Sequence, residues 1–471
     1  MQNLIDRPIE LLELINSCLK PKDIEKKKFG EVFTPFDFIN NMLHDLEVYY
    51  KSKYNKNIYE EKDLKWADTT AGMGNFPVAI YYKLMEGLKK DFPDEKVRKA
   101  HILKNMLYMA EINQKNCFTI KQIFGTDELN LYHGDSLKKE FDTKREEWGI
   151  KNFDIIIGNP PYNEELTTTG ATALYNKFVE YNINKCDLLC FVIPSRWFSG
   201  GKGLDKFRKS MLKKTDIVYI KHFDDASKIF GNSVEIKGGV NYFLKDSKHN
   251  GDCMYNGSMT KLSKYDVLVD SKYHSIIDKV VDYESITSLY KSQDYHKIQT
   301  NDNRFKDEKS QDTIICYVSQ QKGFVKYIEK NEIRSDISKF KVMTPDGAHT
   351  ANSGFGTIFI GNPNEVHCKT YISFEVNSEN EAKSLLSYMN CRLPNLLLSI
   401  RKNSQHTSSS TCKWIPLPPL DRQWNDNDVY EYFKFNDDDI KLVKETKIVG
   451  YKDVIHEEVS KSVFIKVKKT K

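Results

Sequence analysis

Between residues 64 and 244 the sequence alternates short apolar runs with longer stretches of helical spacing, and this alternation permits few folds. The apolar runs that predict strands are 64–67, 106–110, 129–133, 153–157, 188–193, 217–220 and 239–244. The stretches that predict helices are 76–90, 114–123, 173–184 and 204–213. The pattern predicts an α/β fold, a doubly wound and mostly parallel seven-stranded sheet with helices on both faces. Only a turn-rich link, 224–237, joins the last two runs, which allows an antiparallel edge strand.

The composition of the sequence changes after residue 244, where the polar stretch 245–264 predicts a linker. Segments rich in β-formers and glycine follow at 354–359 and 371–376, and helical patterns follow at 379–389 and 393–399. We therefore expect a first domain at 1–250, with an amino-terminal helical segment, and a mixed α+β domain at 255–425. Residues 426–471 are expected to form a small helical tail with a charged end.

The composition narrows the class of protein. The 471 residues carry a net charge of +5, which is compatible with nucleic-acid binding but not diagnostic of it. No apolar run reaches the roughly 18 residues of a membrane span, and the amino terminus lacks the layout of a signal peptide, so we expect no membrane association. The nine cysteines form neither a disulfide framework nor a metal set, so we expect buried thiols and no bound metal.

The fourth apolar run leads through Gly158 into Asn159, Pro160, Pro161 and Tyr162. In an open α/β sheet this quartet lies at the carboxyl end of a strand, where such sheets bind ligands. The two prolines make a stiff turn, and the Pro160 carbonyl and the Asn159 amide oxygen are both hydrogen-bond acceptors. Together with the flat ring of Tyr162 they suit a planar substrate that bears an NH₂ group. A proline turn that caps a core strand is the alternative.

A second polar cluster follows the first strand, in the segment 66–76. Small residues at 71, 72 and 74 let the backbone approach a ligand closely, and the free N–H groups of the next helix face the same pocket. Asp68 stands at its mouth and no lysine follows the glycines, so an ammonium or sulfonium ligand fits better than a phosphate. Glu111 and Asp135 end the next two strands and suit ribose hydroxyls and an adenine amine. The alternatives are a plain glycine turn and two helix caps.

These motifs, in this order, make residues 28–245 resemble the gamma-class N6-adenine DNA methyltransferases of type II restriction–modification systems. The segment 30–35 is similar to the motif that packs on the methionine part of S-adenosylmethionine. The Asp68 loop, Glu111, Asp135 and the quartet at 159–162 are similar to motifs I to IV, and the segment 238–243 to the motif whose aromatic ring stacks on an extruded base. Thr69 and Met73 depart from the proline and threonine that are usual in motif I.

The resemblance implies a role for each matching residue. The catalytic residues would be Asn159, Pro160, Pro161 and Tyr162. The cofactor would be bound by Phe33, Thr34, Pro35, Asp68, Thr70, Ala71, Gly72, Gly74, Asn75, Phe76, Glu111, Ile112, Asp135, Ser136, Asn159 and Phe178, with Tyr175 also against its adenine. Tyr162 and Phe243, with Tyr242 as the second choice, would sandwich the target base. The segment 414–420 resembles the close of a target-recognition domain, and the expected DNA contacts are Arg196, Arg401, Lys402, Gln405, His406 and Lys413.

The implied function is methyl transfer from S-adenosylmethionine to N6 of a flipped adenine in double-stranded DNA, as the modification part of a restriction–modification system. A cytoplasmic protein of a prokaryote or a virus is expected, and a cognate restriction endonuclease stays open as a partner. The alternatives are a protein-glutamine or RNA guanine-N2 methyltransferase, which uses a similar quartet, and a non-catalytic DNA-binding module. A bifunctional restriction enzyme–methyltransferase is a third alternative, although about 30 residues before the methylase region are too few for a nuclease domain.

Overall fold

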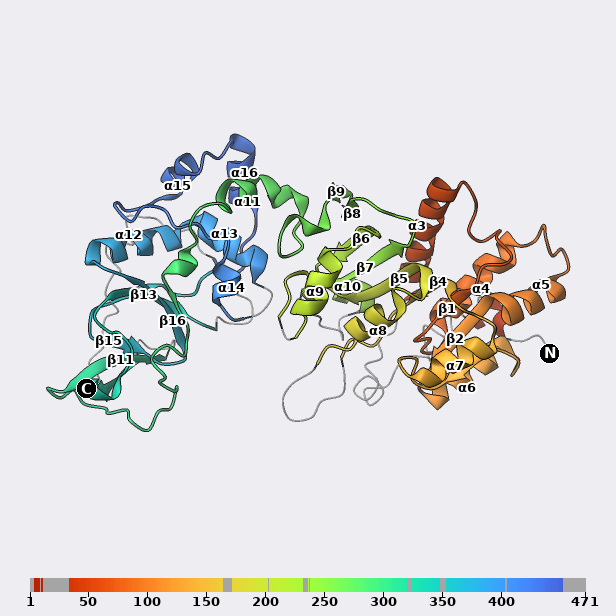
Figure 1. Ribbon diagram of the computed structural model, residues 1–471, viewed down its shortest axis with the longest axis horizontal. Coiled ribbons are helices and arrows are strands. Elements are labelled where there is room, and N and C mark those ends of the chain that lie inside the picture. The colour runs from red at the N-terminus through yellow and green to blue at the C-terminus, as the bar shows by residue number, and fades with distance from the viewer. Residues whose placement is uncertain are drawn as a thin grey trace. The chain divides into compact units, whose positions relative to one another are not determined.

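The computed structural model describes residues 4–8, 10–11, 34–163, 172–201, 203–231, 236, 238–319, 324–347, 353–402 and 405–451. The chain divides into two compact units, Met1–Ser271 and Lys272–Lys471, and Figure 1 draws both. No helix in the described part of the chain combines the length and the apolar character that crossing a membrane requires. Eight cysteines in these ranges are free and buried, which confirms the expected buried thiols.

The first unit is built on a nine-stranded sheet with the order β3-β2-β1-β4-β5-β7-β6-β8-β9. Five strands run parallel: β1 (Trp66–Asp68), β2 (Leu107–Glu111), β3 (Asn130–His133), β4 (Phe153–Gly158) and β5 (Cys186–Pro194). Strand β7 (Val240–Asp246) lies antiparallel between β5 and β6 (Ile217–Phe223). The hairpin of β8 (Cys253–Tyr255) and β9 (Ser258–Thr260) extends the sheet beyond β6.

Helices cover both faces of this sheet. One apolar cluster joins it to α3 (Phe36–Tyr54), α4 (Asn75–Gly87) and α6 (Gln114–Phe124). A second cluster, on the other face, joins it to α7 (Lys139–Glu147), α8 (Tyr175–Asn182) and α9 (Asp205–Leu212). In β5, residues 188, 190 and 192 belong to the first cluster and 189, 191 and 193 to the second. The continuous apolar runs of the sequence are therefore explained by burial on both faces. The helices α5 (Glu95–His101) and α10 (Ser227–Phe230) complete the unit.

The second unit contains two smaller sheets and six helices among the residues described. The first sheet has the order β10 (Tyr290–Lys291), β16 (Tyr371–Val376), β13 (Phe340–Pro345) and β14 (Phe359–Gly361). The second has the order β12 (Phe324–Glu329), β11 (Thr313–Ser319) and β15 (Glu365–His367). The helices are α11 (His274–Val280), α12 (Glu379–Asn390), α13 (Arg392–Arg401), α14 (Ser409–Cys412), α15 (Asp426–Tyr432) and α16 (Asp437–Glu445).

Each of the seven predicted apolar runs overlaps a strand, but the predicted seven-strand count is wrong, because β8 and β9 lie inside the segment 245–264 that was expected to be a linker. Asn256 and Gly257 turn this hairpin with φ of 46° and 84°. Two residues of positive φ form the tight turn that matches strand twist, and Asn-Gly is its strongest sequence signal. The boundary between the units falls after Ser271, and not at 250–255. In the segment 354–359 only Phe359 lies in a strand.

Candidate active site

Strands β1, β2 and β4 are parallel neighbours, so Asp68, Glu111 and Gly158, their last residues, lie at one edge of the sheet. Asp68 is buried, with 1% of its surface exposed. Its Oδ1 accepts a hydrogen bond from the backbone N–H of Thr70 at 3.0 Å, whereas its buried Oδ2 has no partner among the described residues. Burial raises the pKa of Asp68 to about 7, against the lowering effect of the Thr70 hydrogen bonds.

Gly158 explains how the quartet at 159–162 comes close to this acid. A Cβ atom at position 158 would lie 2.6 Å from Asp68 Oδ1 and 3.5 Å from the Thr70 hydroxyl. Such a distance is a steric clash, so the contact between the end of β4 and the Asp68 loop requires glycine. The residue that precedes Asn159 is thus packed directly against the candidate cofactor loop.

Thr34 joins the same two segments from a third part of the chain. Its backbone carbonyl accepts a hydrogen bond from Asn75 Nδ2 at 3.0 Å, and its hydroxyl accepts one from Asn159 Nδ2 at 2.9 Å. Thr34 is buried, and Pro35 after it is the residue before the first turn of α3. Of the predicted amino-terminal motif, Thr34 and Pro35 therefore lie at the site, and Phe33 lies outside the described residues.

Glu111 holds the glycine loop in place. Its Oε2 accepts from the backbone N–H of Gly72 at 2.7 Å, and its Oε1 accepts from the backbone N–H of Asn113 at 2.7 Å. Ile112 beside it is 52% exposed, so its side chain is accessible just after the end of β2. Asp135 Oδ1 accepts from the backbone N–H of Leu137 at 2.9 Å, which fixes the turn after β3.

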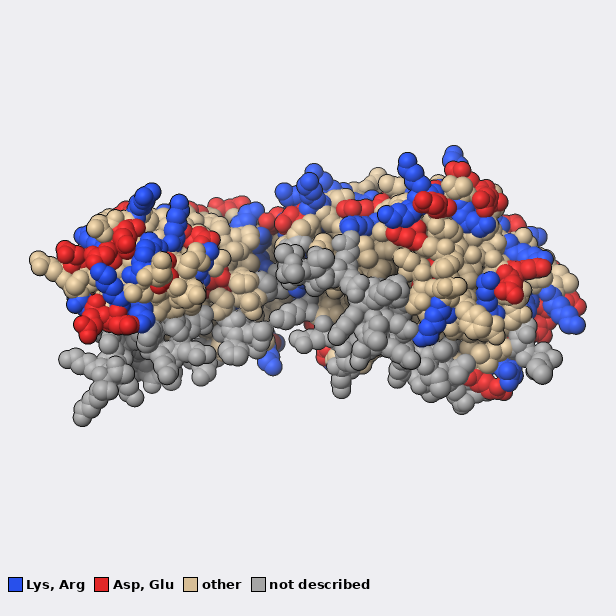
Figure 2. Space-filling model, turned by 90° about the horizontal axis from the view of Figure 1, so that it is seen from below, with Lys and Arg blue, Asp and Glu red and all other residues tan. Residues whose placement is uncertain are grey.

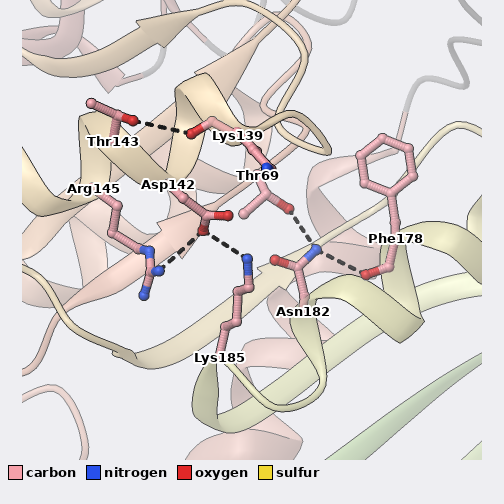
Figure 3. A network of polar contacts seen from close by, with 8 residues as sticks. All are labelled: Thr69, Lys139, Asp142, Thr143, Arg145, Phe178, Asn182 and Lys185. Atoms are coloured by element: carbon pink, nitrogen blue, oxygen red, sulfur yellow. Dashed lines mark hydrogen bonds and ion pairs between the residues drawn. The ribbon is translucent and has the colours of Figure 1, made fainter.

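A second group of residues forms hydrogen bonds with Thr69, the residue that follows Asp68 in the loop. Asn182 Nδ2 donates to the Thr69 hydroxyl at 3.4 Å and to the Phe178 carbonyl at 2.9 Å, and Ser136 Oγ donates to the Thr69 carbonyl at 2.7 Å. Figure 3 shows Asn182 between Thr69 and Phe178, beside a separate ion-pair cluster centred on Asp142. Thr69 departs from the family's usual proline, and the structure holds its backbone carbonyl through Ser136 and its side chain through Asn182. Sequence reasoning missed Asn182 because Thr69, the loop residue to which it donates, lies 113 positions away in the sequence.

The ring of Tyr162 is buried, with 5% of its surface exposed. It packs with Ala226 and Val240 and against the partly buried Phe223 and Phe230. Burial raises the pKa of its hydroxyl far above the ordinary value, while an interaction with the Asn159 side chain opposes this rise. The two side chains that were expected to grip the substrate are therefore neighbours, and α10 covers one of them.

Comparisons with known proteins agree with this geometry. Residues 94–230, which include Glu111, Asp135 and the quartet at 159–162, match the family described as Eco57I restriction-modification methylase. A protein described as an uncharacterized adenine-specific methylase from Mycoplasma pneumoniae (strain ATCC 29342 / M129 / Subtype 1) is 24% identical over 332 residues, or 54% of this chain and 76% of that protein. The resemblance to the adenine-specific methylases of restriction–modification systems is confirmed.

Two solved structures share the fold of this chain. One is a nuclease-deletion mutant of the Type ISP restriction-modification enzyme LlaGI in complex with a DNA substrate mimic, with a TM-score of 0.54, 13% identity, and coverage of 88% of this chain and 47% of that chain. The other is the ATP-dependent Type ISP enzyme LlaBIII bound to DNA, with a TM-score of 0.53, 13% identity, and coverage of 94% and 41%. This chain thus spans less than half the length of either enzyme.

The resemblance to methyltransferases predicted that Phe243, or as second choice Tyr242, stacks on the target base. In the structure both rings lie in the core. Phe243 has no exposed surface and belongs to the apolar cluster on the α8 and α9 face. Tyr242 belongs to the opposite cluster and stacks on Phe223 with a centroid distance of 5.9 Å. Neither can lie against a base without unpacking the sheet, so this prediction is corrected. The aromatic rings that pack in the cluster of Tyr162 are those of Phe223 and Phe230.

The expected DNA contacts separate into buried and exposed side chains. Arg401 is buried, lies 4.3 Å from the ring centroid of Trp414, and donates from Nε to the Ser410 carbonyl at 2.9 Å. Lys402 is buried, donates to the Gly354 carbonyl at 3.2 Å, and burial lowers its pKa to about 8. These two cations stabilise the second unit, which corrects their assignment as DNA contacts.

The remaining expected contacts are accessible. Gln405, His406 and Lys413 are exposed, and Arg196 is half-buried after β5. The His406 ring nitrogen Nδ1 lies 2.7 Å from Asp346 Oδ2, so this side chain is oriented by a buried acid. On the face in Figure 2, basic and acidic side chains are interspersed on each unit, in keeping with the net charge of only +5.

Proposed function

We propose that this chain transfers a methyl group from S-adenosylmethionine to N6 of an adenine in double-stranded DNA, as the modification activity of a restriction–modification system. The main support for the proposal is that Asn159 lies close to the Asp68 loop. Gly158 packs against Asp68 so closely that a Cβ atom would clash, and Thr34 is hydrogen-bonded to both Asn75 and Asn159. The hydrogen-bond acceptors proposed for the target amine, at Asn159 and Pro160, and the acid proposed for the cationic cofactor, Asp68, therefore lie at the same edge of the sheet.

The residues present fit this cofactor. The buried Oδ2 of Asp68, which lacks a partner among the described residues, suits a positively charged group. A Cβ atom added at Gly72 would meet no atom of the described residues within 4 Å, so these residues leave space beside the loop at that point. Glu111 is a hydroxyl acceptor at the end of β2, where related folds bind ribose. When bound, S-adenosylmethionine supplies a methyl group on a positively charged sulfur.

The chain's own residues would act on the nucleotide. The amine of adenine is a weak nucleophile, because its lone pair is delocalised into the ring. Asn159 Oδ1 and the Pro160 carbonyl would accept its two hydrogens and favour a more tetrahedral nitrogen. Positive charge that develops on that nitrogen is stabilised by these fixed dipoles, and holding the amine in place lowers the entropic part of the barrier.

The target amine lies inside a base pair, so the adenine must leave the helix at a cost of a few kcal/mol. Stacking on Tyr162 and Phe230 would offset part of this cost, because a base on an aromatic ring contributes about 1–3 kcal/mol. Since α10 covers Tyr162 in the structure, the segment that carries Phe230 would have to shift to admit a base. The second unit is proposed to select the sequence, with Gln405, His406 and Lys413 on its accessible surface.

The experiment is a transfer assay with tritiated cofactor and three acceptors: duplex DNA, RNA and a glutamine-containing protein substrate. Label is expected in DNA, and mass spectrometry of the nucleosides should find N6-methyladenine. Asn159→Ala should abolish transfer with cofactor affinity kept, whereas Asn163→Ala, an exposed neighbour of the same chemistry, should stay active. Label in RNA or protein alone, or full activity of Asn159→Ala, would refute the proposal. Sequencing of DNA from expressing cells, with a method that detects N6-methyladenine, would then identify the site.

A further inference from the structure

The Thr34 hydroxyl is one of the groups that orient the candidate catalytic amide, because it accepts a hydrogen bond from Asn159 Nδ2. An asparagine carboxamide has two chemically different branches, because Oδ1 accepts hydrogen bonds and Nδ2 donates them. In the structure the Nδ2 branch of Asn159 donates to Thr34 Oγ1 at 2.9 Å, across 125 positions of sequence. The Oδ1 branch therefore points away from Thr34, since the two branches of a planar amide diverge.

Thr34 is itself held firmly. It is 4% exposed, its carbonyl is bonded to Asn75 at the first position of α4, and Pro35 fixes the backbone as the chain enters α3. The carbonyl of Pro35 accepts the N–H of Ile39 at 3.1 Å. These contacts anchor the Thr34 backbone, so its hydroxyl can set the position of a hydrogen-bond partner.

We propose that Thr34 is a positioning residue for methyl transfer, whose hydroxyl holds the Asn159 amide with its acceptor branch toward the target amine. This inference rests on the proposed function and adds a catalytic consequence to a residue that the family resemblance assigns to the cofactor. If the amide turned over, its NH₂ group would face the NH₂ group of the adenine, donor against donor, and the weak nucleophile would lose one of its two acceptors.

The test compares three variants of nearly the same shape. Thr34→Val keeps the branched side chain and removes the acceptor, Thr34→Ser keeps the hydroxyl, and Thr34→Cys offers a weaker acceptor. Turnover is measured at saturating DNA and cofactor, and cofactor affinity is measured separately by calorimetry. We expect kcat to fall about tenfold in Thr34→Val, which corresponds to the roughly 1.4 kcal/mol of one hydrogen bond. Thr34→Ser should retain most of kcat, Thr34→Cys should fall between the two, and cofactor Kd should change less than threefold.

The possible outcomes distinguish a failure of the positioning role of Thr34 from a failure of the proposed function. A wild-type chain that methylates no DNA contradicts the proposed function, whatever the variants do. An active wild type with kcat unchanged in Thr34→Val, or with kcat and cofactor affinity lost in parallel, overturns the positioning role. Equal loss in Thr34→Ser and Thr34→Val would also overturn it, because the serine keeps the hydroxyl. If Thr34→Val does not fold, the order of kcat in the serine and cysteine variants decides the question.

Discussion

We predict that Asp68 makes the binding of the proposed cationic cofactor depend on pH, over a range set by the pKa of this carboxyl group. Burial raises the pKa of Asp68 to about 7 in the protein without ligand, compared with 3.8 for the ordinary carboxyl group. A positive group beside the ionised carboxylate would bind well, and beside the protonated form poorly. Between pH 6 and pH 8 the ionised fraction rises from about 0.09 to about 0.9 for a group with this pKa. We therefore expect the Kd for S-adenosylmethionine to fall about tenfold over this range.

Isothermal titration calorimetry measures both the affinity and the proton that accompanies it. At pH 6, binding should release close to one proton, seen as a dependence of the heat on the ionisation enthalpy of the buffer, and at pH 8 it should release almost none. Asp68→Asn keeps the shape of the side chain and should bind weakly, with no dependence on pH in this range. Equal affinity of the wild type at pH 6 and pH 8, without proton release, would disprove the assigned role of Asp68.

The same shift has a consequence for stability, and its sign follows from proton binding. The folded protein without ligand keeps the Asp68 proton up to about pH 7, whereas the unfolded chain loses it near pH 4, so the free energy of unfolding falls as the pH rises between these values. For one carboxyl group the loss between pH 5 and pH 8 amounts to about 3 kcal/mol. Urea unfolding of Asp68→Asn should therefore show a flatter pH profile than the wild type, and parallel profiles would contradict the shift.

Three further predictions concern packing and DNA. Gly158→Ala should lower the free energy of unfolding by about 2 kcal/mol in urea, because its Cβ would overlap Asp68 Oδ1; an unchanged midpoint would contradict the clash. Phe230→Ala should lower kcat/KM for DNA about tenfold, as expected for one lost stacking contact, and leave cofactor affinity intact; equal kcat/KM would exclude the ring from the base site. Arg401→Met should lower the free energy of unfolding by about 1–2 kcal/mol, because the contacts of Arg401 with Trp414 and Ser410 are lost. Lys413→Ser should leave stability unchanged and should reduce the slope of the salt dependence of DNA binding by about one unit. The reverse result would refute the assignment of Arg401 to stability and Lys413 to DNA binding.

The framework of the first unit was predictable from the sequence for a physical reason. Parallel strands that are buried on both faces must be apolar throughout, so their runs are visible without knowledge of the fold. The acids that end neighbouring strands then have to meet, which is why Asp68 and Glu111 could be placed at one edge before the coordinates were known. The β8–β9 hairpin was missed because the polar residues around Asn256 and Gly257 outweighed the turn signal that they contained.

Burial of cations in the second unit could not be predicted in the same way. Arg401 and Lys402 lie at the end of α13, and in sequence they resemble the accessible basic side chains that contact phosphates. Their partners are Trp414, Ser410 and Gly354, which tertiary packing brings to them. The bond between Thr34 and Asn159 was equally invisible, because no local pattern links residues 125 positions apart.

The error at Phe243 follows from where a strand can present a substrate contact. Successive side chains of a strand point to opposite faces, and in the first unit helices cover both faces, so Tyr242 and Phe243 each enter a different apolar cluster. A ring in the middle of such a strand has no route to a ligand, whichever face it takes. Ligand contacts are expected from residues at or beyond the strand ends, as proposed for Asp68 at the end of β1 and for Asn159 after β4. Phe230 meets this condition because it closes α10, in the connection that precedes β7, and shares a cluster with Tyr162. Its place beyond the strand end is therefore the reason why we predict base stacking at Phe230 and not at a residue within β7.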